Sequence, residues 1–292
     1  MGKARAIVKR RKAVQNIRKI TRTMQLIATA RFQAAFNRAT KTRPYTEQIT
    51  QMVERLARAQ ADLEHPLLRV NTESKRSRLI VVTSNRGLCG GYNASLLRGA
   101  MEHIKACEAA GQALDLYVMG KKGIGYFKFL GRAMAQTDAR FEDKPQFAQV
   151  EPIATGMIEA YERREVDAVH VTYMRFVSTG VQRVHTMQLL PIEPPSAEAE
   201  PLVPAVSVQF DFSPPAEELL GELLPEMVKV RLFQSLVDAA VSEQVARMVA
   251  MKAATESAGD MIRTLTRQYN RARQTQITLE LLDIVAGAEA LK

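Results

Sequence analysis

Apolar positions recur at helical spacing at both ends of the chain. From about Pro215 to Gly287 the pattern predicts one very long helix, with Pro214 just before its start and Gly287 just after its end. Pro225 predicts a kink or a short separate first helix. At 1.5 Å per residue the uninterrupted part is roughly 90 Å long. One small core cannot cover such a helix, so the pattern predicts a partner helix, a partner protein or both.

A second helical pattern covers residues 3 to about 60, and Pro44 is expected to bend this helix without ending it. The apolar stripe is narrow, which is typical of a coiled-coil seam. The C-terminal helix is the natural mate, so the two ends of the chain predict an antiparallel coiled coil. The stripe consists of Ile7, Val14, Ile17, Ile20, Met24, Ile27, Ala28 and Ala35, followed after Pro44 by Ile49, Met52, Val53 and Leu56.

Between the two helices the pattern changes to short apolar runs that alternate with helical segments. Strands are predicted at 79–82 and 114–119, helices at 96–110, 123–130 and 147–164, and a hairpin from 166–176 and 181–190. A further strand is possible at 206–210, inside a proline-rich loop. Strand–helix alternation favours parallel pairing. The predicted fold class is therefore α/β with a long coiled coil: an N-terminal coiled-coil helix (1–60), a small Rossmann-like α/β globular domain (77–212) and a C-terminal coiled-coil helix (215–292).

The net charge of +10 is unevenly distributed. Residues 1–46 contain no Asp or Glu but thirteen Lys and Arg. Such a segment can bind nucleic acid, act as an organellar transit peptide, or meet an acidic protein partner, and a plain solvated helix face is the default. The helical register continues to Leu56 without a processing site, which disfavours the transit peptide. Charge alone does not decide between nucleic acid, an acidic partner and a solvated face.

Composition narrows the class further. No apolar run approaches the length of a membrane span, and the N-terminus lacks an apolar signal-peptide core. Two cysteines, Cys89 and Cys107, do not make a disulfide framework, which fits a reducing compartment. The four histidines show no metal-ligand spacing. A soluble, cytoplasmic chain without a metal or cofactor is expected.

A glycine-rich turn follows the first predicted strand and consists of Arg86, Gly87, Leu88, Cys89, Gly90 and Gly91. Such a turn can hold a phosphate on backbone N–H groups, but it lacks the spacing of a P-loop and of the dinucleotide fingerprint, as does the segment 120–123. A tight strand-to-helix turn is the favoured interpretation. Cys89 has no base near it in sequence, and no catalytic constellation emerges. A Rossmann-like enzyme nevertheless remains an alternative.

Four stretches, at 14–24, 86–91, 242–255 and 277–290, resemble in order the gamma subunit of rotary F-type ATP synthases. The resemblance covers both ends and the middle of the chain. It implies a central-stalk rotor whose terminal helices form an asymmetric coiled coil inside a ring of three alpha and three beta subunits. The α/β domain is then expected beside the epsilon subunit and the membrane c-ring.

The resemblance also implies a non-catalytic chain without a cofactor, since ATP is made or hydrolysed on alpha and beta. Membrane contact would be indirect, through the ring, at the cytoplasmic face of the inner membrane, and no nucleic acid is expected. Lys19 and Met24 match positions that meet the acidic lever of beta. Four residues match positions that touch the catch regions of the ring or couple to the N-terminal helix: Arg247, Gln274, Thr278 and Glu280. Ser213 stands where some relatives carry an acidic residue. The alternative function is that of a basic coiled-coil protein that binds nucleic acid.

Overall fold

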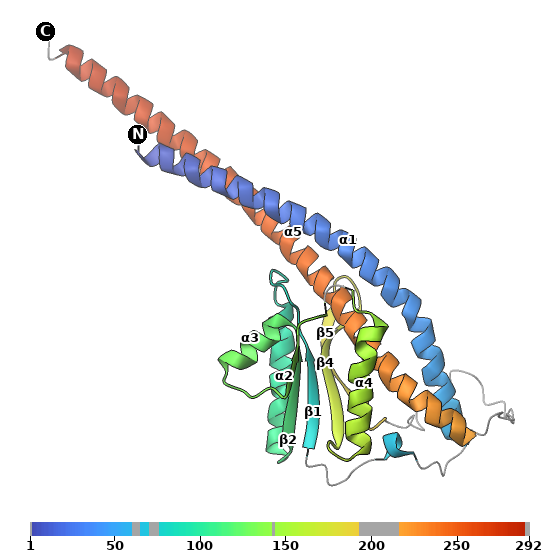
Figure 1. Ribbon diagram of the computed structural model, residues 1–292. Coiled ribbons are helices and arrows are strands. Elements are labelled where there is room, and N and C mark those ends of the chain that lie inside the picture. Colours follow the sequence, from blue (N-terminus) through green and yellow to red (C-terminus); the bar gives the residue numbers. More distant parts are fainter. Residues whose placement is uncertain (1, 60–64, 70–75, 142–143, 193–215, 290–292) are drawn as a thin grey trace. The chain divides into compact units, whose positions relative to one another are not determined.

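The computed structural model describes residues 2–59, 65–69, 76–141, 144–192 and 216–289 (Figure 1). Two long helices, α1 (Gly2–Ala59) and α5 (Ala216–Glu289), contribute to two compact units. One unit consists of Met1–Ala30 with Arg247–Lys292, and the other of Arg31–Ala246. Both helices continue through their internal prolines, Pro44 and Pro225. The prediction of a short separate helix before Pro225 is therefore wrong, because α5 already begins at Ala216 and continues through Pro225.

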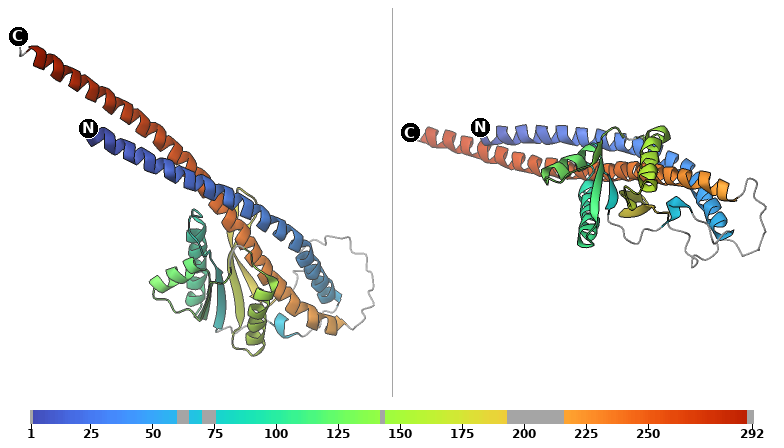
Figure 2. Two further views of the ribbon diagram at one scale, coloured as in Figure 1. Left: turned by 45° about the horizontal axis from the view of Figure 1, so that its top comes forward. Right: turned by 60° about the horizontal axis from the view of Figure 1, so that its bottom comes forward.

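In the first unit α1 and α5 lie side by side (Figures 1 and 2). The guanidinium carbon of Arg11 lies 5.4 Å from the ring centroid of Tyr269, and the hydroxyls of Thr21 and Thr255 are hydrogen-bonded at 2.9 Å. Residue numbers rise along α1 while the numbers of the contacting residues on α5 fall, so the two helices are antiparallel, as predicted. In both views α5 extends past the first turn of α1.

The seam of this helix pair is narrow and repeats every seven residues. On α5 it buries Met251, Ala258 and Leu265, and on α1 it buries Val14 and Ala28. The predicted stripe on α1 is wrong in part, because three of its large members face solvent. These are Ile17, Ile20 and Ile27, with exposed fractions of 52%, 58% and 48%. Thr21 and alanines occupy the true seam, since small side chains let two helices approach closely.

The second unit contains a five-stranded sheet in the order β3-β2-β1-β4-β5. Its strands are β1 (Arg76–Val82), β2 (Ala113–Met119), β3 (Gln136–Asp138), β4 (Ala168–Phe176) and β5 (Gln182–Leu190). β3, β2, β1 and β4 are parallel, and β5 closes an antiparallel hairpin with β4. The predicted parallel pairing and hairpin are confirmed. The three-residue β3 and the short helix Pro66–Leu68 were not predicted, and the possible strand at 206–210 lies outside the described residues.

Alternation along β1 divides the core of this unit. Leu79 and Val81 face a cluster with α2 (Tyr92–Ala109) and α3 (Lys121–Phe129), the helices on one side of the sheet. Ile80 and Val82 face the larger cluster, which contains α4 (Phe147–Glu162) and the parts of α1 and α5 that belong to this unit. Among the described residues, none of the helices combines the length and apolar character that crossing a bilayer requires.

Candidate functional site

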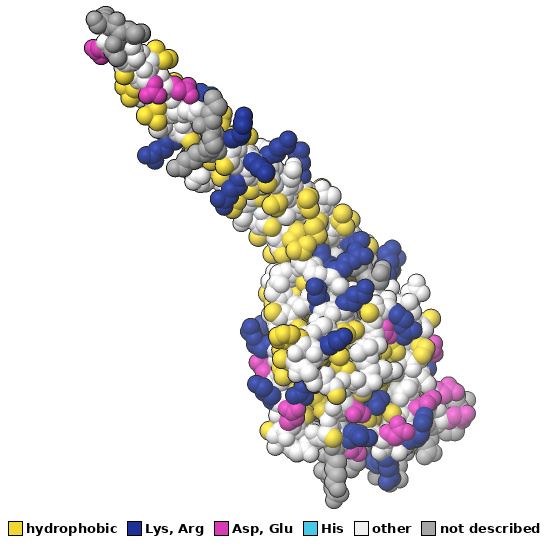
Figure 3. Space-filling model, turned by 60° about the vertical axis from the view of Figure 1, so that its left-hand side comes forward, with side chains coloured by type: hydrophobic (Ala, Val, Ile, Leu, Met, Phe, Trp, Pro, Cys, Tyr) yellow, Lys and Arg dark blue, Asp and Glu magenta, His cyan; other side chains and the backbone are white. Residues whose placement is uncertain are grey.

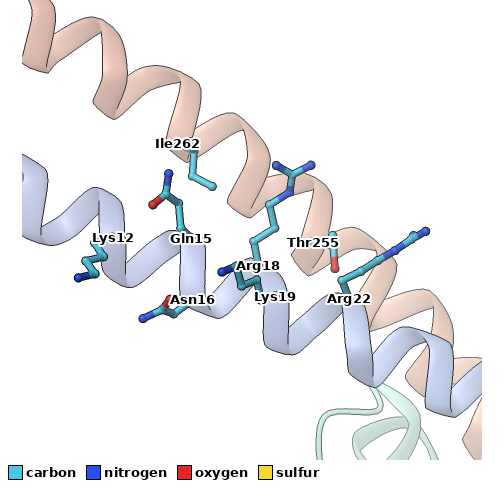
Figure 4. Close-up of a pocket in the computed structure, with 8 residues that line it drawn as sticks. All are labelled: Lys12, Gln15, Asn16, Arg18, Lys19, Arg22, Thr255 and Ile262. Atoms are coloured by element: carbon cyan, nitrogen blue, oxygen red, sulfur yellow. The ribbon is translucent and has the colours of Figure 1, made fainter.

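Lys19 lines a basic groove on the paired helices, with a volume of about 740 Å³ (Figure 4). Its cations are Lys12, Arg18, Lys19 and Arg22. Lys12 and Lys19 are seven residues apart on α1, and Arg18 and Arg22 are four apart, so they lie along one side of the helix. Among the described residues, no carboxylate lines the groove, and the first acidic residue in the sequence is Glu47. The groove therefore presents positive charge to any partner. Its lining residues are Lys12, Gln15, Asn16, Arg18, Lys19, Arg22, Thr255 and Ile262.

Arg18 lies against the facing helix at Gly259. The Cζ and Nε atoms of Arg18 come within 3.9 Å of the position that a side chain at Gly259 would occupy. The stem of Arg18 thus crosses the seam, while the basic side chains remain at the surface. On the face in Figure 3, Lys and Arg side chains lie along the paired helices, and acidic ones gather near the end of α5.

Met24 belongs to a second apolar stripe on α1, separate from the seam. Ile17, Ile20, Met24 and Ile27 follow spacings of three, four and three, which keeps them on one face of the helix. Met24 is half-buried, whereas the three isoleucines are exposed. Lys19 lies within this segment of α1. The two predicted lever residues therefore lie on the same stretch of α1 but on different sides of it: Lys19 lines the basic groove, and Met24 belongs to the apolar stripe.

The three predicted residues near the end of α5, Gln274, Thr278 and Glu280, are all exposed. The start of α1 reaches only as far as a groove of about 700 Å³ whose lining includes Ala4 on α1 and Leu279 on α5. Past that groove, the described part of α5 has no part of α1 beside it (Figures 1 and 2). This end exposes large apolar side chains: Ile277, Leu279, Leu281, Leu282, Ile284 and Val285.

Arg247 differs from the other predicted contact residues. Its side chain is only 7% exposed. Gln274 lies 27 positions later on the same helix, which is about 40 Å along the axis. The structure therefore does not bring Arg247 together with Gln274, Thr278 and Glu280.

The glycine-rich turn 86–91 is closed by its own hydrogen bonds. The Ser84 hydroxyl donates to the carbonyl of Arg86 at 2.7 Å, and the amide of Asn93 donates to Ser84 Oγ at 2.8 Å. The same amide lies 3.2 Å from the buried sulfur of Cys89. Leu88 and Gly90 adopt positive φ, 62° and 58°, which reverses the chain sharply. This geometry is that of the predicted tight strand-to-helix turn.

The N-terminus of α3, beside this turn, has its first amides already occupied. The N–H groups of Lys121, Lys122 and Gly123 donate to the Asn85 side chain, the Ser84 carbonyl and the Thr83 hydroxyl, at 3.0, 3.1 and 2.8 Å. A phosphate at a helix N-terminus needs such amides unengaged. A phosphate at the start of α3 is therefore disfavoured.

A cluster that the sequence did not single out lies between α2 and β4. The rings of His103 and His170 are 4.6 Å apart, and His103 Nε2 lies 3.6 Å from the sulfur of Cys107. Burial, with the neighbouring His103, lowers the pKa of His170 to about 4, and its Nδ1 atom is buried without a hydrogen-bond partner. Within the described residues, no three His, Cys, Asp or Glu side chains are arranged to hold a metal ion. Only the four-residue spacing on α2 was visible in the sequence.

The fold and these surfaces define a class of protein. Such a protein combines an antiparallel pair of long helices, which has a basic groove and an exposed apolar end, with a small α/β unit. A family model described as ATP synthase matches residues 3–291. The ATP synthase gamma chain of Rhodopirellula baltica is 47% identical to this chain over 295 residues, and the match covers 100% of each chain. That of Frankia casuarinae is 40% identical and covers 99% of this chain and 98% of its own length. The chain belongs to the ATP synthase gamma-chain family.

Solved structures show the same fold. A chain from the Euglena gracilis mitochondrial ATP synthase, in an assembly described as OSCP/F1/c-ring, has a TM-score of 0.71 at 19% identity and covers 99% of this chain and 95% of its own length. A chain of the Tetrahymena thermophila mitochondrial ATP synthase, described as central stalk/c-ring, has a TM-score of 0.60 at 20% identity, with 80% and 99% covered. At these identities the likeness is one of fold.

Proposed function

We propose that this chain is the central-stalk rotor subunit of an F-type ATP synthase. In this proposal ion flow turns a membrane ring, and the chain turns with it. Its paired helices then push each beta subunit through its catalytic states. ATP is made or hydrolysed on the alpha and beta subunits, so this chain supplies positioning and torque rather than a catalytic group or a cofactor. Membership of the gamma-chain family and the antiparallel helix pair support the proposal.

The observation that carries the proposal is the uncovered apolar end of α5. Ile277, Leu281 and Ile284 are at least half exposed, and Ile284 reaches 73%. A soluble monomer rarely leaves a contiguous apolar patch of this kind in water, so such a patch marks a partner surface. An enclosing ring of alpha and beta subunits would remove this surface from solvent on all sides of the helix. Gln274, Thr278 and Glu280, exposed on the same segment, are proposed to touch the ring there.

Lys19 and Met24 are proposed to meet the acidic lever of beta. The basic groove around Lys19 contains no carboxylate, and an acidic lever is complementary to it in charge. Met24 would supply apolar contact from another side of α1. Arg247 is proposed to act inside the protein, because its burial favours coupling between packed elements over direct contact with the ring.

The α/β body, proposed to span 77–212 between helical domains 1–60 and 215–292, is assigned to the end of the stalk near the membrane. There the epsilon subunit and the c-ring are its proposed partners. Membrane association would be peripheral, through the ring, on the cytoplasmic side. The gamma-chain family does not favour the alternative of a nucleic-acid-binding protein, despite the acid-free N-terminus. A DNA titration separates the two, since non-specific binding to DNA weakens steeply with salt.

Rotation tests the proposal directly. The chain would carry Phe129→Cys as an attachment point, since Phe129 is 88% exposed while Cys89 and Cys107 are buried. After assembly with alpha and beta subunits held on a surface, a bead attached to this cysteine should turn in one direction when ATP is added. The isolated chain should hydrolyse no ATP. A bead that only fluctuates while the assembly hydrolyses ATP would contradict the rotor role.

A further inference from the structure

Two histidines and a cysteine border one hollow in the α/β unit. The hollow has a volume of about 390 Å³, and its lining includes His103 and Cys107 from α2 and His170 from β4. All three residues belong to the unit formed by residues 31–246. The rotor role proposed above uses none of them, so this cluster of nitrogen and sulfur atoms needs a separate explanation.

His103 and Cys107 are spaced like two ligands of one metal ion. They are four residues apart on α2, so their side chains leave the same face of the helix. His103 Nε2 lies 3.6 Å from Cys107 Sγ. In a tetrahedral metal site, bonds of about 2.1 Å to nitrogen and about 2.3 Å to sulfur place the two ligand atoms about 3.6 Å apart. The observed separation therefore already matches that of a chelate.

The protonation states of the two side chains also suit a metal ion. Burial lowers the pKa of His103, so its imidazole is neutral at pH 7 and one ring nitrogen keeps its lone pair. Burial, together with the neighbouring Glu108, raises the pKa of the Cys107 thiol. Such a thiol is a poor nucleophile, which disfavours oxidation or alkylation. A cation that binds sulfur strongly can still displace its proton.

His170 supplies an independent sign of a ligand in the same place. Its ring centroid lies 4.6 Å from that of His103, and its Nδ1 atom is buried without a hydrogen-bond partner among the described residues. Buried polar atoms in folded proteins are nearly always hydrogen-bonded, and an ion or water in the neighbouring space explains many of the exceptions. A water molecule carried by a bound cation would provide the missing hydrogen bond.

We propose that His103 and Cys107 form a binding site for a soft monovalent cation of the Cu(I) type. On binding, one bond forms from the cation to Cys107 Sγ and one to His103 Nε2. The S–H bond of Cys107 breaks and its proton passes to solvent, and no electron is transferred. Thiolate sulfur selects soft cations, and imidazole also binds copper.

The number of ligands favours Cu(I) over Zn²⁺. A protein site for Zn²⁺ uses three or four protein ligands. Within the described residues, no three His, Cys, Asp or Glu side chains are arranged to hold an ion together. Cu(I) forms stable complexes with only two protein ligands. The pair on α2 is therefore sufficient for Cu(I) and insufficient for Zn²⁺.

The test is an anaerobic titration of the purified full-length chain with Cu(I) held on a coloured chelator. We expect one Cu(I) per chain and a new ultraviolet absorption band from charge transfer between sulfur and copper. Cys107→Ser should abolish the band, and His103→Gln should weaken binding by about tenfold or more. Cys89→Ser is the matched control, because Cys89 is also buried but its sulfur lies 3.2 Å from the Asn93 amide. This control should bind Cu(I) like the unaltered chain.

Several results would overturn the proposal. Binding that persists in Cys107→Ser means that the thiol is not a ligand. Unchanged affinity in His103→Gln reduces the site to a single thiol, and equal weakening in Cys89→Ser identifies unspecific binding to thiols. Zn²⁺ bound as tightly as Cu(I), or no binding of Cu(I), contradicts the assignment of two ligands. Circular dichroism should be the same in all three variants, since none of the substitutions removes a large apolar side chain.

Discussion

The helix α5 has two halves that are held in different ways. Its residues up to Ala246 lie in the α/β unit, where Leu224, Val228 and Leu232 are completely buried in a core shared with the sheet and α4. From Arg247 onward the helix belongs to the unit in which it pairs with α1, and there the buried residues Met251, Ala258 and Leu265 recur every seven positions. One sequence element thus passes from a wide core to a narrow seam.

The wide core and the narrow seam hold α5 in mechanically different ways. A wide core fixes a helix against rotation and translation, because many interdigitated side chains must move together. A narrow seam of small and polar residues holds two helices alongside each other while leaving most of their surface open. For the proposed rotor, the first arrangement suits an anchor and the second suits a shaft that must turn within a sleeve.

The largest expected effect comes from opening a cavity in the wide core. Leu232 is completely buried, so Leu232→Ala removes packed methyl groups without an easy collapse of the surroundings. We expect a loss of about 3 kcal/mol in the local free energy of unfolding. Hydrogen exchange followed by mass spectrometry should show the loss in peptides of the α/β unit. A loss below about 1 kcal/mol would mean that this half of α5 is not held by packing.

Acidification should weaken the α/β unit and spare the helix pair. The pKa of His170 is lowered to about 4 in the folded protein, so between pH 6.5 and 4 the unfolded chain binds the extra proton. The contribution of His170 to stability is therefore complete above pH 6.5 and is lost as pH falls toward 4, by about 2 kcal/mol. All four histidines lie between residues 31 and 246. Exchange rates measured across this pH range should change mainly there.

The variant His170→Asn tests whether protonation of His170 causes this pH dependence. His170→Asn should flatten the pH dependence, because it removes the group that gains the proton. Asp238 acts in the opposite direction, since burial raises the pKa of its carboxyl. An unchanged pH profile in His170→Asn would assign the dependence to another group.

The narrow seam should respond less than the core to the same chemical change. Leu265 is a buried seam residue that packs with Val14 and Ala258. Leu265→Ala should cost about 1–2 kcal/mol, below the usual range for a deep core, because few side chains surround it and solvent can enter. The same exchange measurement, on peptides of 1–30 and 247–289, compares it directly with Leu232→Ala. Equal losses would show that the seam is as tightly packed as the core.

The sequence predicted the long helices and the parallel sheet well, because their periodicities extend over many residues. It identified the seam of α1 only in part, through Val14 and Ala28. Apolar character alone added Ile17, Ile20 and Ile27 to the predicted stripe, whereas the structure places the polar Thr21 against Thr255 of α5. A second, outward stripe on one helix has the same spacing as a seam. Only the position of the partner helix distinguishes them.

The candidate surfaces were predictable to different degrees. The basic groove follows from the acid-free N-terminus, and the roles of Lys19 and Met24 came from resemblance to the gamma family. The burial of Arg247 and the approach of His103 to His170 depend on tertiary packing, which brings distant segments together. Neither arrangement leaves a periodic signal in the sequence.

Met24→Lys should have the smallest effect on stability. Its expected effect is on function. Met24→Lys adds a charge to the exposed apolar stripe of α1, so the free energy of unfolding should change by no more than about 0.5 kcal/mol. Under the rotor proposal the new lysine disturbs contact with the beta lever. ATP made per transported ion should then fall, while assembly with alpha and beta continues. Phe129→Lys is the control, since Phe129 is 88% exposed and lies at the end of α3, outside the helix pair. Equal coupling in the two variants, measured in vesicles that contain the complete synthase, would remove Met24 from the contact surface.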